Sequence, residues 1–515
     1  DVVVVERRPG GTQGVEGCWR AVAVQRAQER RPLSGEKEPK GEALAKTRSV
    51  RDVPVTLGLR HPWLRTVLER ASLLLRQAWV QTSTTFSLHR ETLMYPQLRY
   101  GVALTVALLS LTAQADLQEQ LDALEPGASF ELPPEQISSL AIRVPGVSVS
   151  CHEETVIDPG GQGNAVDIVA EEVTFSGCAV RNWGSNLNEL DAGIFVARGA
   201  RGVVVENNRL DGPGFGVWLD ATPDVTVRNN TIRGDDSLRP NDRGNGIHLF
   251  NTTGALIEGN DIRQTRDAIY IETANNNTIR GNEMADLRYG IHYMYSMNNL
   301  LENNVTRNTR TGYALMQSKR LTVINNRSVN DENYGILMNF ITQSELRGNV
   351  VTGVSQGQTA GVAIEGAEGK AVFIYNSLYN TFEGNVFADS NIGIHLTAGS
   401  EDNEVFGNAF VNNQRQVKYV ATRTQEWSKG NSGNFWSDYL GWDRNQDGVG
   451  DVPYEPNDNV DRLLWKYPEA KVLMFSPAVD TLRWVQDAFP VVKAAGVTDS
   501  HPLMRMPAEL QPEIR

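Results

Sequence analysis

Positive charge is scarce in the larger part of this 515-residue chain. Residues 1–115 hold 17 Lys and Arg against 10 Asp and Glu, whereas residues 116–515 hold 32 against 52, a net charge of −20. Proteins that bind nucleic acids place Lys and Arg along one face to displace the counterions of the phosphates. The acidic body therefore argues against a nucleic-acid binder and suits cations or cationic surfaces.

Long apolar runs and clustered catalytic side chains are also scarce. The run Gly101–Leu111 is far shorter than the about 20 apolar residues that span a membrane, so it does not predict a membrane helix.

A polysaccharide lyase, epimerase or hydrolase needs clustered carboxylates, a base and an arginine on one face. On the outer face this chain offers only Glu272, with Tyr270 between two histidines. A sugar-modifying enzyme or a carbohydrate-binding protein is therefore the alternative rather than the main hypothesis.

A repeat with a fixed period dominates what is present. Related segments begin at Gly246, Ala268, Gly290 and Gly312, with a step of 22 residues each time. A fixed period of this length is the signature of stacked coils, and the apolar residues alternate within each coil as they do in strands. We therefore predict an all-β chain that folds as a right-handed parallel β-helix of about 22-residue coils.

Asparagine marks a second position of the repeat. It recurs at Asn208, Asn230, Asn260, Asn282, Asn304, Asn326, Asn349, Asn385 and Asn408. Asparagine tolerates the left-handed turn conformation, and its amide can bond to its copy in the next coil. We interpret these residues as corners of the coils and not as catalytic groups.

Composition divides the chain into five parts. We expect residues 1–93 to be a disordered, non-native upstream extension, because they are rich in arginine and lack the repeat. Residues 94–115 combine a short basic region, an apolar run and small residues near their end, which is typical of a secretory signal peptide. We then expect the β-helix with its N-terminal cap at 116–425, an aromatic loop at 426–455 and an amphipathic tail at 456–515.

Two cysteines have the spacing of one coil. Cys151 and Cys178 are 27 residues apart. Adjacent coils lie ~4.8 Å apart and a disulfide joins Cα atoms ~4.4–6.8 Å apart, so the two can pair in an oxidising compartment. We predict a structural disulfide, with free core thiols or metal ligands as the alternatives.

Strand alternation places His292 and Met294 on the outer face of one coil. The matching positions one coil later are Ala314 and Met316. Met294 and Met316 are therefore expected side by side at ~4.8 Å, with the imidazole close by. Thioether sulfurs select Cu(I), and Met297, just beyond the strand, offers a third sulfur. We predict a copper site formed by this histidine and the three methionines, with packing of the methionines beneath a loop as the alternative.

Two similar residues fit this site less well. His248 lies two coils from His292, roughly 9.6 Å away, which is too far for the two imidazoles to share one ion. Met338 falls at an inward position of its strand, so we expect it in the apolar core.

A second cation site is predicted in the segment DRNQDGVGDVPY. Asp443, Asn445 and Asp447 follow the spacing in which alternate side chains wrap a hard cation, and Asp451 follows farther along. The twelfth position of this loop holds Tyr454 instead of the usual bidentate Glu. We predict a calcium-stabilised loop, with a purely hydrogen-bonded Asx turn as the alternative.

Several long segments match a known family. They include RYGIHYMYSMNN, GYALMQS, NYGILMNF, QVKYVATRTQEWS and FWSDYLGWDRNQDGVGDVPY. From Met94 to about Met504 the chain resembles NosD, the family of nitrous oxide reductase maturation proteins. Residues 1–93 match nothing in that family.

The resemblance implies a periplasmic protein that is not an enzyme. It implies an ABC transporter, made of a permease and an ATPase, with which the protein supplies copper, held transiently as Cu(I), to nitrous oxide reductase. A copper-donating lipoprotein and membrane association through the transporter are further implications. The copper ligands come from the stacking argument and not from a family motif. We expect the tail at 456–492 to bind the permease, because it carries more large apolar groups than the end of a solenoid requires.

Overall fold

The computed structural model describes most of the repeat region and parts of the tail. The described residues are 117–356, 368–397, 399–420, 423–457, 476–488 and 496–514. The expected upstream extension and signal peptide lie outside them, as does much of the tail. Among these described segments, no helix combines the length and apolar character needed to cross a membrane.

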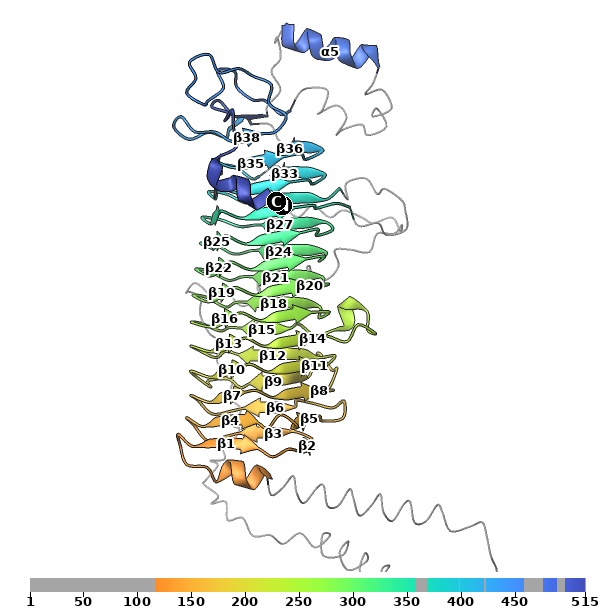
Figure 1. Ribbon diagram of the computed structural model, residues 1–515, viewed down its shortest axis with the longest axis vertical. Helices are drawn as coiled ribbons and strands as arrows, with labels where there is room; N and C mark the ends of the chain where they lie inside the picture. The colour runs from red at the N-terminus through yellow and green to blue at the C-terminus, as the bar shows by residue number, and fades with distance from the viewer. Residues whose placement is uncertain are drawn as a thin grey trace, which may run out of the picture. The chain divides into compact units, whose positions relative to one another are not determined.

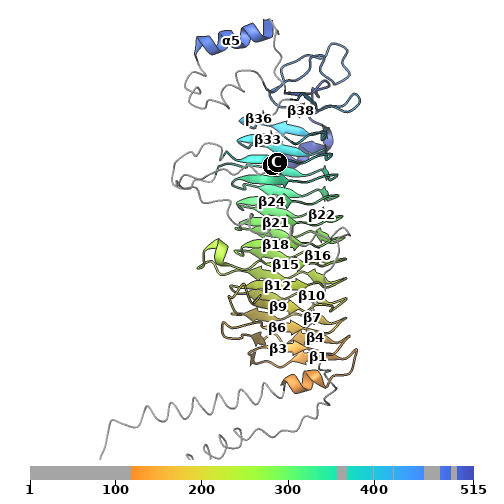
Figure 2. The same ribbon diagram turned by 180° about the vertical axis from the view of Figure 1, so that it is seen from behind.

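The described chain winds through three long parallel sheets, A, B and C, in turn. Strands that are three apart in sequence are neighbours in space, because each coil contributes one strand to each sheet (Figure 1). Seen from behind, the strands of sheet C stack in the same order (Figure 2). This arrangement confirms the predicted parallel β-helix.

Sheet A has 12 short strands. They are β1 Ser129–Leu132, β4 Ser148–Cys151, β7 Thr174–Ser176, β10 Val204–Glu206, β13 Thr226–Arg228, β16 Leu256–Glu258, β19 Thr278–Arg280, β22 Leu300–Glu302, β25 Thr322–Ile324, β28 Glu345–Arg347, β31 Thr381–Glu383 and β34 Glu404–Phe406.

Sheet B has 13 strands, which are also short. They are β2 Gln136–Ile137, β5 Val156–Ile157, β8 Ala179–Arg181, β11 Arg209–Asp211, β14 Thr231–Arg233, β17 Asp261–Arg263, β20 Glu283–Ala285, β23 Val305–Arg307, β26 Arg327–Val329, β29 Val350–Thr352, β32 Val386–Ala388, β35 Ala409–Val411 and β38 Phe435–Trp436.

Sheet C has 12 strands, most of them longer, and so presents the widest outer face. They are β3 Leu140–Ile142, β6 Val166–Ile168, β9 Ala192–Val196, β12 Phe215–Asp220, β15 Ile247–Phe250, β18 Asp267–Glu272, β21 Tyr289–Met294, β24 Thr311–Met316, β27 Tyr334–Asn339, β30 Lys370–Tyr375, β33 Ile392–Thr397 and β36 Arg415–Val420.

The remaining elements are few. They are the 3-10 helix η1 Pro240–Asp242, the strand pair β37 Gln425–Glu426 and β39 Val497–Thr498, the helix α5 Pro477–Ala488 and the 3-10 helix η3 Ala508–Ile514. A short helix over 117–122 begins the described chain.

The core is a column of apolar side chains enclosed by the three sheets. Ile269, Ile291 and Tyr313 follow one another in register on β18, β21 and β24, and each is at most 1% exposed. Burying one such side chain stabilises the fold by about 1.5–3 kcal/mol. Met338 is fully buried, as its inward position predicted.

The predicted asparagine column is a ladder of hydrogen bonds. Asn282 Nδ2 donates to Asn304 Oδ1 at 2.9 Å, and Asn304 Nδ2 donates to Asn326 Oδ1 at 2.9 Å. The expected left-handed backbone at these asparagines is wrong, however. It belongs to the residue before each of them, for example Asn303 with φ 55° and Gly281 with φ 63°. The ladder residue itself needs an ordinary backbone so that its amide can point along the stack.

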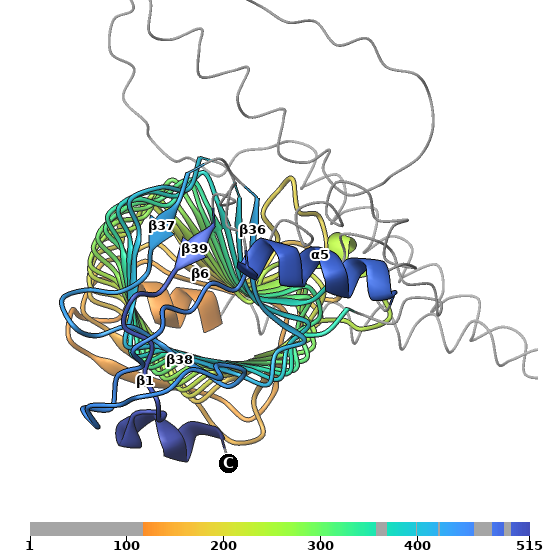
Figure 3. The same cartoon turned by 90° about the horizontal axis from the view of Figure 1, so that it is seen from above.

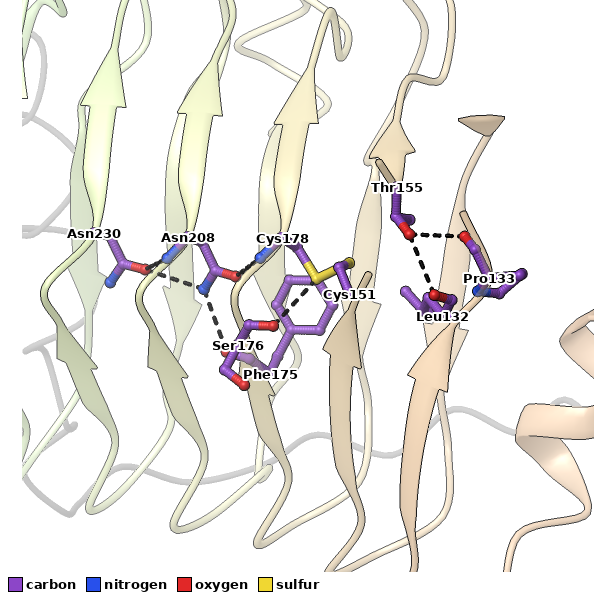
Figure 4. The surroundings of a disulfide bond; sticks show 9 residues. All are labelled: Leu132, Pro133, Cys151, Thr155, Phe175, Ser176, Cys178, Asn208 and Asn230. Atoms are coloured by element: carbon purple, nitrogen blue, oxygen red, sulfur yellow. Dashed lines mark hydrogen bonds between the residues drawn. A yellow bond between two sulfur atoms is a disulfide. The ribbon is translucent and has the colours of Figure 1, made fainter. Parts of the chain in front are cut away.

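A disulfide stands at the start of this ladder. Cys151 and Cys178 are bonded, with their Cα atoms 5.0 Å apart, as the one-coil spacing predicted. The backbone N–H of Cys178 donates to Asn208 Oδ1 at 2.9 Å, so the ladder continues directly from the cystine (Figure 4). The disulfide therefore joins two coils at the N-terminal end of the asparagine ladder, where the ladder has a neighbour on one side only.

Aromatic residues and the second strand pair close the other end. Viewed along the coils, β37, β38 and β39 lie over the end of the solenoid (Figure 3). The ring of Trp436 stacks on Phe410 with centroids 4.2 Å apart, and Asp499 Oδ2 accepts a bond from the backbone N–H of Asn434 at 2.7 Å. We expected the β-helix to end at residue 425, but β38 adds one more strand to sheet B. Asp499 occupies the place of the next ladder asparagine.

Candidate metal centre

Sheet C places two of the predicted methionine ligands side by side. Met294 on β21 is in register with Met316 on β24, and His292 is in register with Ala314. The two methionine side chains are half-buried. Ala314, the neighbour of His292 in the next coil, is small and fully buried. Two thioethers and one imidazole thus share a single face of two neighbouring strands.

His292 lies on this outer face but is only 8% exposed. Its ring stacks on Tyr270 with centroids 4.4 Å apart and meets the edge of Tyr289 at 4.9 Å. Its Nδ1 lies 2.9 Å from Asp267 Oδ2, whereas its Nε2 is buried and has no hydrogen-bond partner. The sequence did not predict this burial, because aromatic side chains of the outer face cover the imidazole.

Asp267 determines which nitrogen of His292 carries the proton. Burial opposes ionisation of this carboxyl, but hydrogen bonds from His292 and Arg288 outweigh burial and hold the pKa of Asp267 well below its usual value. An ionised carboxylate can only accept, so Nδ1 of His292 must donate. In the neutral ring the lone pair is then on Nε2, the arrangement found in metal-binding histidines that are held by a carboxylate.

Arg288 holds Asp267 in turn. Its Nε and Nη2 donate to the two carboxylate oxygens at 2.8 and 2.6 Å. Asp267 is 1% exposed, so this bidentate pair is shielded from water and fixes the carboxylate in one orientation. Neither Asp267 nor Arg288 was among the residues predicted from the sequence.

Met297 lies apart from the other predicted ligands. It follows the corner after β21, where its backbone pairs with Lys319. Its sulfur lies 3.8 Å from Nη2 of Arg320. The strand register therefore places His292, Met294 and Met316 on one face of two neighbouring strands, whereas the sulfur of Met297 contacts Arg320, and copper binding by these residues stays a prediction.

The acidic loop after β38 directs its carboxylates at the backbone. Gly448 N–H donates to Asp443 Oδ2 at 2.8 Å, Val449 N–H to Asp447 Oδ1 at 2.9 Å, and Arg444 N–H to Asp451 Oδ2 at 2.7 Å. Asn445 Nδ2 donates to Asp447 Oδ2 at 2.9 Å. These are the contacts of the alternative, a hydrogen-bonded Asx turn. Across the described segments, no three His, Cys, Asp or Glu side chains are grouped to hold a metal, and calcium binding here stays a prediction.

Comparison with known proteins places the chain in a family. Residues 232–441 match the family described as "Periplasmic copper-binding protein (NosD)". A "Probable ABC transporter binding protein NosD" of Pseudomonas aeruginosa is 63% identical over 358 residues, which cover 70% of this chain and 84% of that relative. The chain belongs to the NosD family.

Two further similarities extend the comparison. The NosD relative of Stutzerimonas stutzeri is 55% identical over 417 residues, or 80% of this chain and 95% of that relative. Among solved structures, the Streptococcus pneumoniae surface adhesin PfbA is 11% identical with a TM-score of 0.46, covering 60% of this chain and 96% of that chain. The region matched to the NosD family contains the whole face from His248 to Met316.

Proposed function

We propose that this NosD-family protein is the periplasmic component of an ABC-type copper-supply complex. In this role it carries copper for assembly of the metal centre of nitrous oxide reductase and catalyses no reaction of its own. Family membership supports a copper-binding role, because the family is described as periplasmic and copper-binding. The observation that carries the proposal is the register of Met294 with Met316 on the sheet face that also holds His292, whose buried Nε2 has no hydrogen-bond partner.

The donor set suits copper as a cargo. Soft thioether sulfurs prefer Cu(I) over zinc or calcium, and a neutral imidazole nitrogen is a good ligand for copper. Asp267 and Arg288 hold His292 in one orientation and one tautomer. Two methionines and one histidine are few ligands, and Met294 and Met316 are half-buried rather than enclosed, so the ion can be passed on.

The C-terminal helix supplies the surface for the transporter. On α5, Leu482 is 50% exposed, Trp484 64% and Val485 40%. Apolar side chains gathered on one short amphipathic helix are typical of a docking surface. In our proposal α5 meets the permease, whose ATPase is the third component, and a lipoprotein donates the copper. The other large apolar residues of the tail, such as Trp465 and Phe489, lie outside the described residues.

The metal face is tested by replacing both methionines. Met294→Leu/Met316→Leu keeps volume and apolarity, so we expect the free energy of unfolding to change by less than about 1.5 kcal/mol. We expect the affinity for Cu(I), measured anaerobically against a chromophoric Cu(I) chelator, to fall at least about 100-fold because both sulfurs are lost. The matched control is Met338→Leu, the same change at a core methionine. Undiminished binding by the folded double variant would rule out this site.

A further inference from the structure

Arg266 is half-buried but has no acceptor for its guanidinium. It lies at the corner between β17 and β18, one residue before Asp267. Its Nε is buried and has no hydrogen-bond partner, and within the described ranges no oxygen accepts a hydrogen bond from the rest of its guanidinium. A buried donor without an acceptor destabilises the folded protein. Arg266 therefore keeps free donors at a place that is partly shielded from water.

Arginines elsewhere on the solenoid are paired with carboxylates. Arg228 and Arg280 of sheet A each lie 2.6 Å from a glutamate that is 22 residues earlier, in the preceding coil. At the corner before sheet C the residue 22 positions after Arg266 is a second arginine, Arg288, whose backbone N–H donates to the carbonyl of Arg266 at 2.9 Å. Like charges repel, so this corner sets two cations where sheet A sets an ion pair.

Asp267 compensates only one of these two charges. Both of its carboxylate oxygens accept hydrogen bonds from Arg288, and none comes from Arg266. Burial, together with the charge of Arg288, lowers the pKa of Arg266, but a guanidinium stays charged in proteins. Two guanidinium groups and one carboxylate leave one positive charge uncompensated. A ligand with a single negative charge would balance it.

Two tyrosines next to Arg266 offer further donors. Tyr270 and Tyr289 both interact electrostatically with Arg266. Their side chains are half-buried, and among the residues that the structure describes neither hydroxyl has a hydrogen-bond partner. Their rings are the two that contact the imidazole of His292. The uncompensated charge therefore lies beside the face that carries the predicted copper ligands.

We propose that Arg266, Tyr270 and Tyr289 form a binding site for a carboxylate group, with Arg288 supplying the second positive charge. Nε and one terminal nitrogen of Arg266 donate to the two carboxylate oxygens, and the phenol hydroxyls donate from the sides. The parallel N–H groups of a guanidinium match the two oxygens of a carboxylate, which a chloride ion lacks. A phosphate carries about two negative charges, more than this site compensates.

The carboxylate has two possible sources with the same chemistry. One is a free small carboxylate, and the other is the side chain of an aspartate or glutamate on a protein that docks beside His292. The site itself contains no copper ligand. Its test therefore needs no copper and is independent of the proposed function.

Nitrogen NMR of the full chain with isotope-labelled arginine tests the site. Sodium acetate is titrated against sodium chloride of equal ionic strength. We expect one Nε–H signal, absent from Arg266→Gln, to shift saturably with acetate and to move little with chloride. In Arg266→Gln, acetate binding followed at the Arg288 signal should weaken at least about 10-fold, because the bidentate donor is lost. The control is Arg280→Gln, which removes a paired arginine of sheet A and should leave acetate binding unchanged.

Tyr289→Phe is the second variant, because it keeps the ring beside His292 and removes only the hydroxyl. We expect it to weaken acetate binding about 2–10-fold. It decides the question if circular dichroism shows that Arg266→Gln is unfolded. Undiminished acetate binding in the folded variants would overturn the site.

The ligands themselves supply the remaining outcomes. The absence of a saturable shift at Arg266 with acetate, or an equal shift with chloride, would overturn the site, and tighter binding of phosphate than of acetate would overturn its assignment to a carboxylate. A short peptide with blocked ends and a single glutamate distinguishes the two sources. Tighter binding of this peptide than of acetate assigns the site to a protein partner, and equal or weaker binding assigns it to a free small carboxylate.

Discussion

The asparagine ladder and the outer face of sheet C are both columns of side chains spaced one coil apart, but they behave differently along the stack. In the ladder the same residue recurs, and each amide bonds to the next, as Asn282, Asn304 and Asn326 do. On the outer face the residue type changes at every coil. The column reads Trp218, His248, Tyr270, His292 and Ala314.

The two columns also differ in how many polar atoms are satisfied. Ladder amides have donors and acceptors in the neighbouring coils, whereas Nε2 of both His248 and His292 is buried without a hydrogen-bond partner. A buried polar group without a partner costs about 1–3 kcal/mol. Repetition therefore marks the part of a coil that stabilises the solenoid, and a break in repetition combined with unsatisfied atoms marks the part available for a ligand.

The largest expected effect follows from breaking the ladder at its centre. Asn304→Ala removes a fully buried amide. The backbone N–H of Asn282 then loses its acceptor, Asn282 Nδ2 loses one of its acceptors, and the carbonyl of Ile279 loses the amide that donates to it. We expect the free energy of unfolding in urea to fall by roughly 3–6 kcal/mol, because several buried groups lose a bond at once. Copper bound per folded chain should not change. The exposed Asn188→Ala is the control, and a comparable loss there would remove the distinction between ladder and surface asparagines.

A smaller loss of stability is expected when the disulfide at the start of the ladder is removed. Cys151→Ser/Cys178→Ser opens a crosslink across 27 residues at the first coils. Chain-entropy arguments give roughly 2–4 kcal/mol for such a loop. Urea unfolding of the variant, compared with the unchanged protein under reducing and non-reducing conditions, measures it. Equal stability of all four samples would show that the bond contributes nothing, and the Cu(I) affinity should be unaffected throughout.

The smallest effect is expected for Asp267→Asn, which replaces one carboxylate oxygen beside His292 by an amide nitrogen and should weaken Cu(I) binding. In Asp267→Asn the amide can donate to His292 Nδ1, which moves the ring proton to Nε2 and blocks the lone pair. Loss of such a supporting carboxylate typically weakens metal binding about 10–100-fold. Nitrogen NMR of labelled histidine reports the tautomer, and the Cu(I) chelator titration reports the affinity.

The control for this change is Asp261→Asn, which removes a carboxylate paired with Arg233 and Arg263 on sheet B. It should leave both the tautomer of His292 and copper binding as they are. If Asp267→Asn bound Cu(I) as tightly as the unchanged protein, Asp267 would be a structural residue only.

The period of the sequence was enough to predict the coils, the register of Met294 with Met316 and the pairing of Cys151 with Cys178. These features depend on one number, the length of a coil, because residues at the same position of successive coils must meet. The same reasoning correctly separated the inward Met338 from the outward Met316. The same reasoning was wrong about the backbone of the corners. It assigned the left-handed conformation to the ladder asparagines, whereas the residue before each of them adopts it.

Contacts that cross from one column to another were decided only by the tertiary structure. Asp267 reaches His292 from one coil earlier and from a different position of its strand, so no period of the sequence connects them. The approach of Glu272 to His248 likewise depends on how two side chains turn across neighbouring strands. The repeat determines where a backbone position lies, whereas side-chain torsions and the packing of Tyr270 between the two imidazoles determine which atoms are left free. Those torsions respond to the three-dimensional neighbours of each residue, and for that reason the ligand geometry appears only in the folded protein.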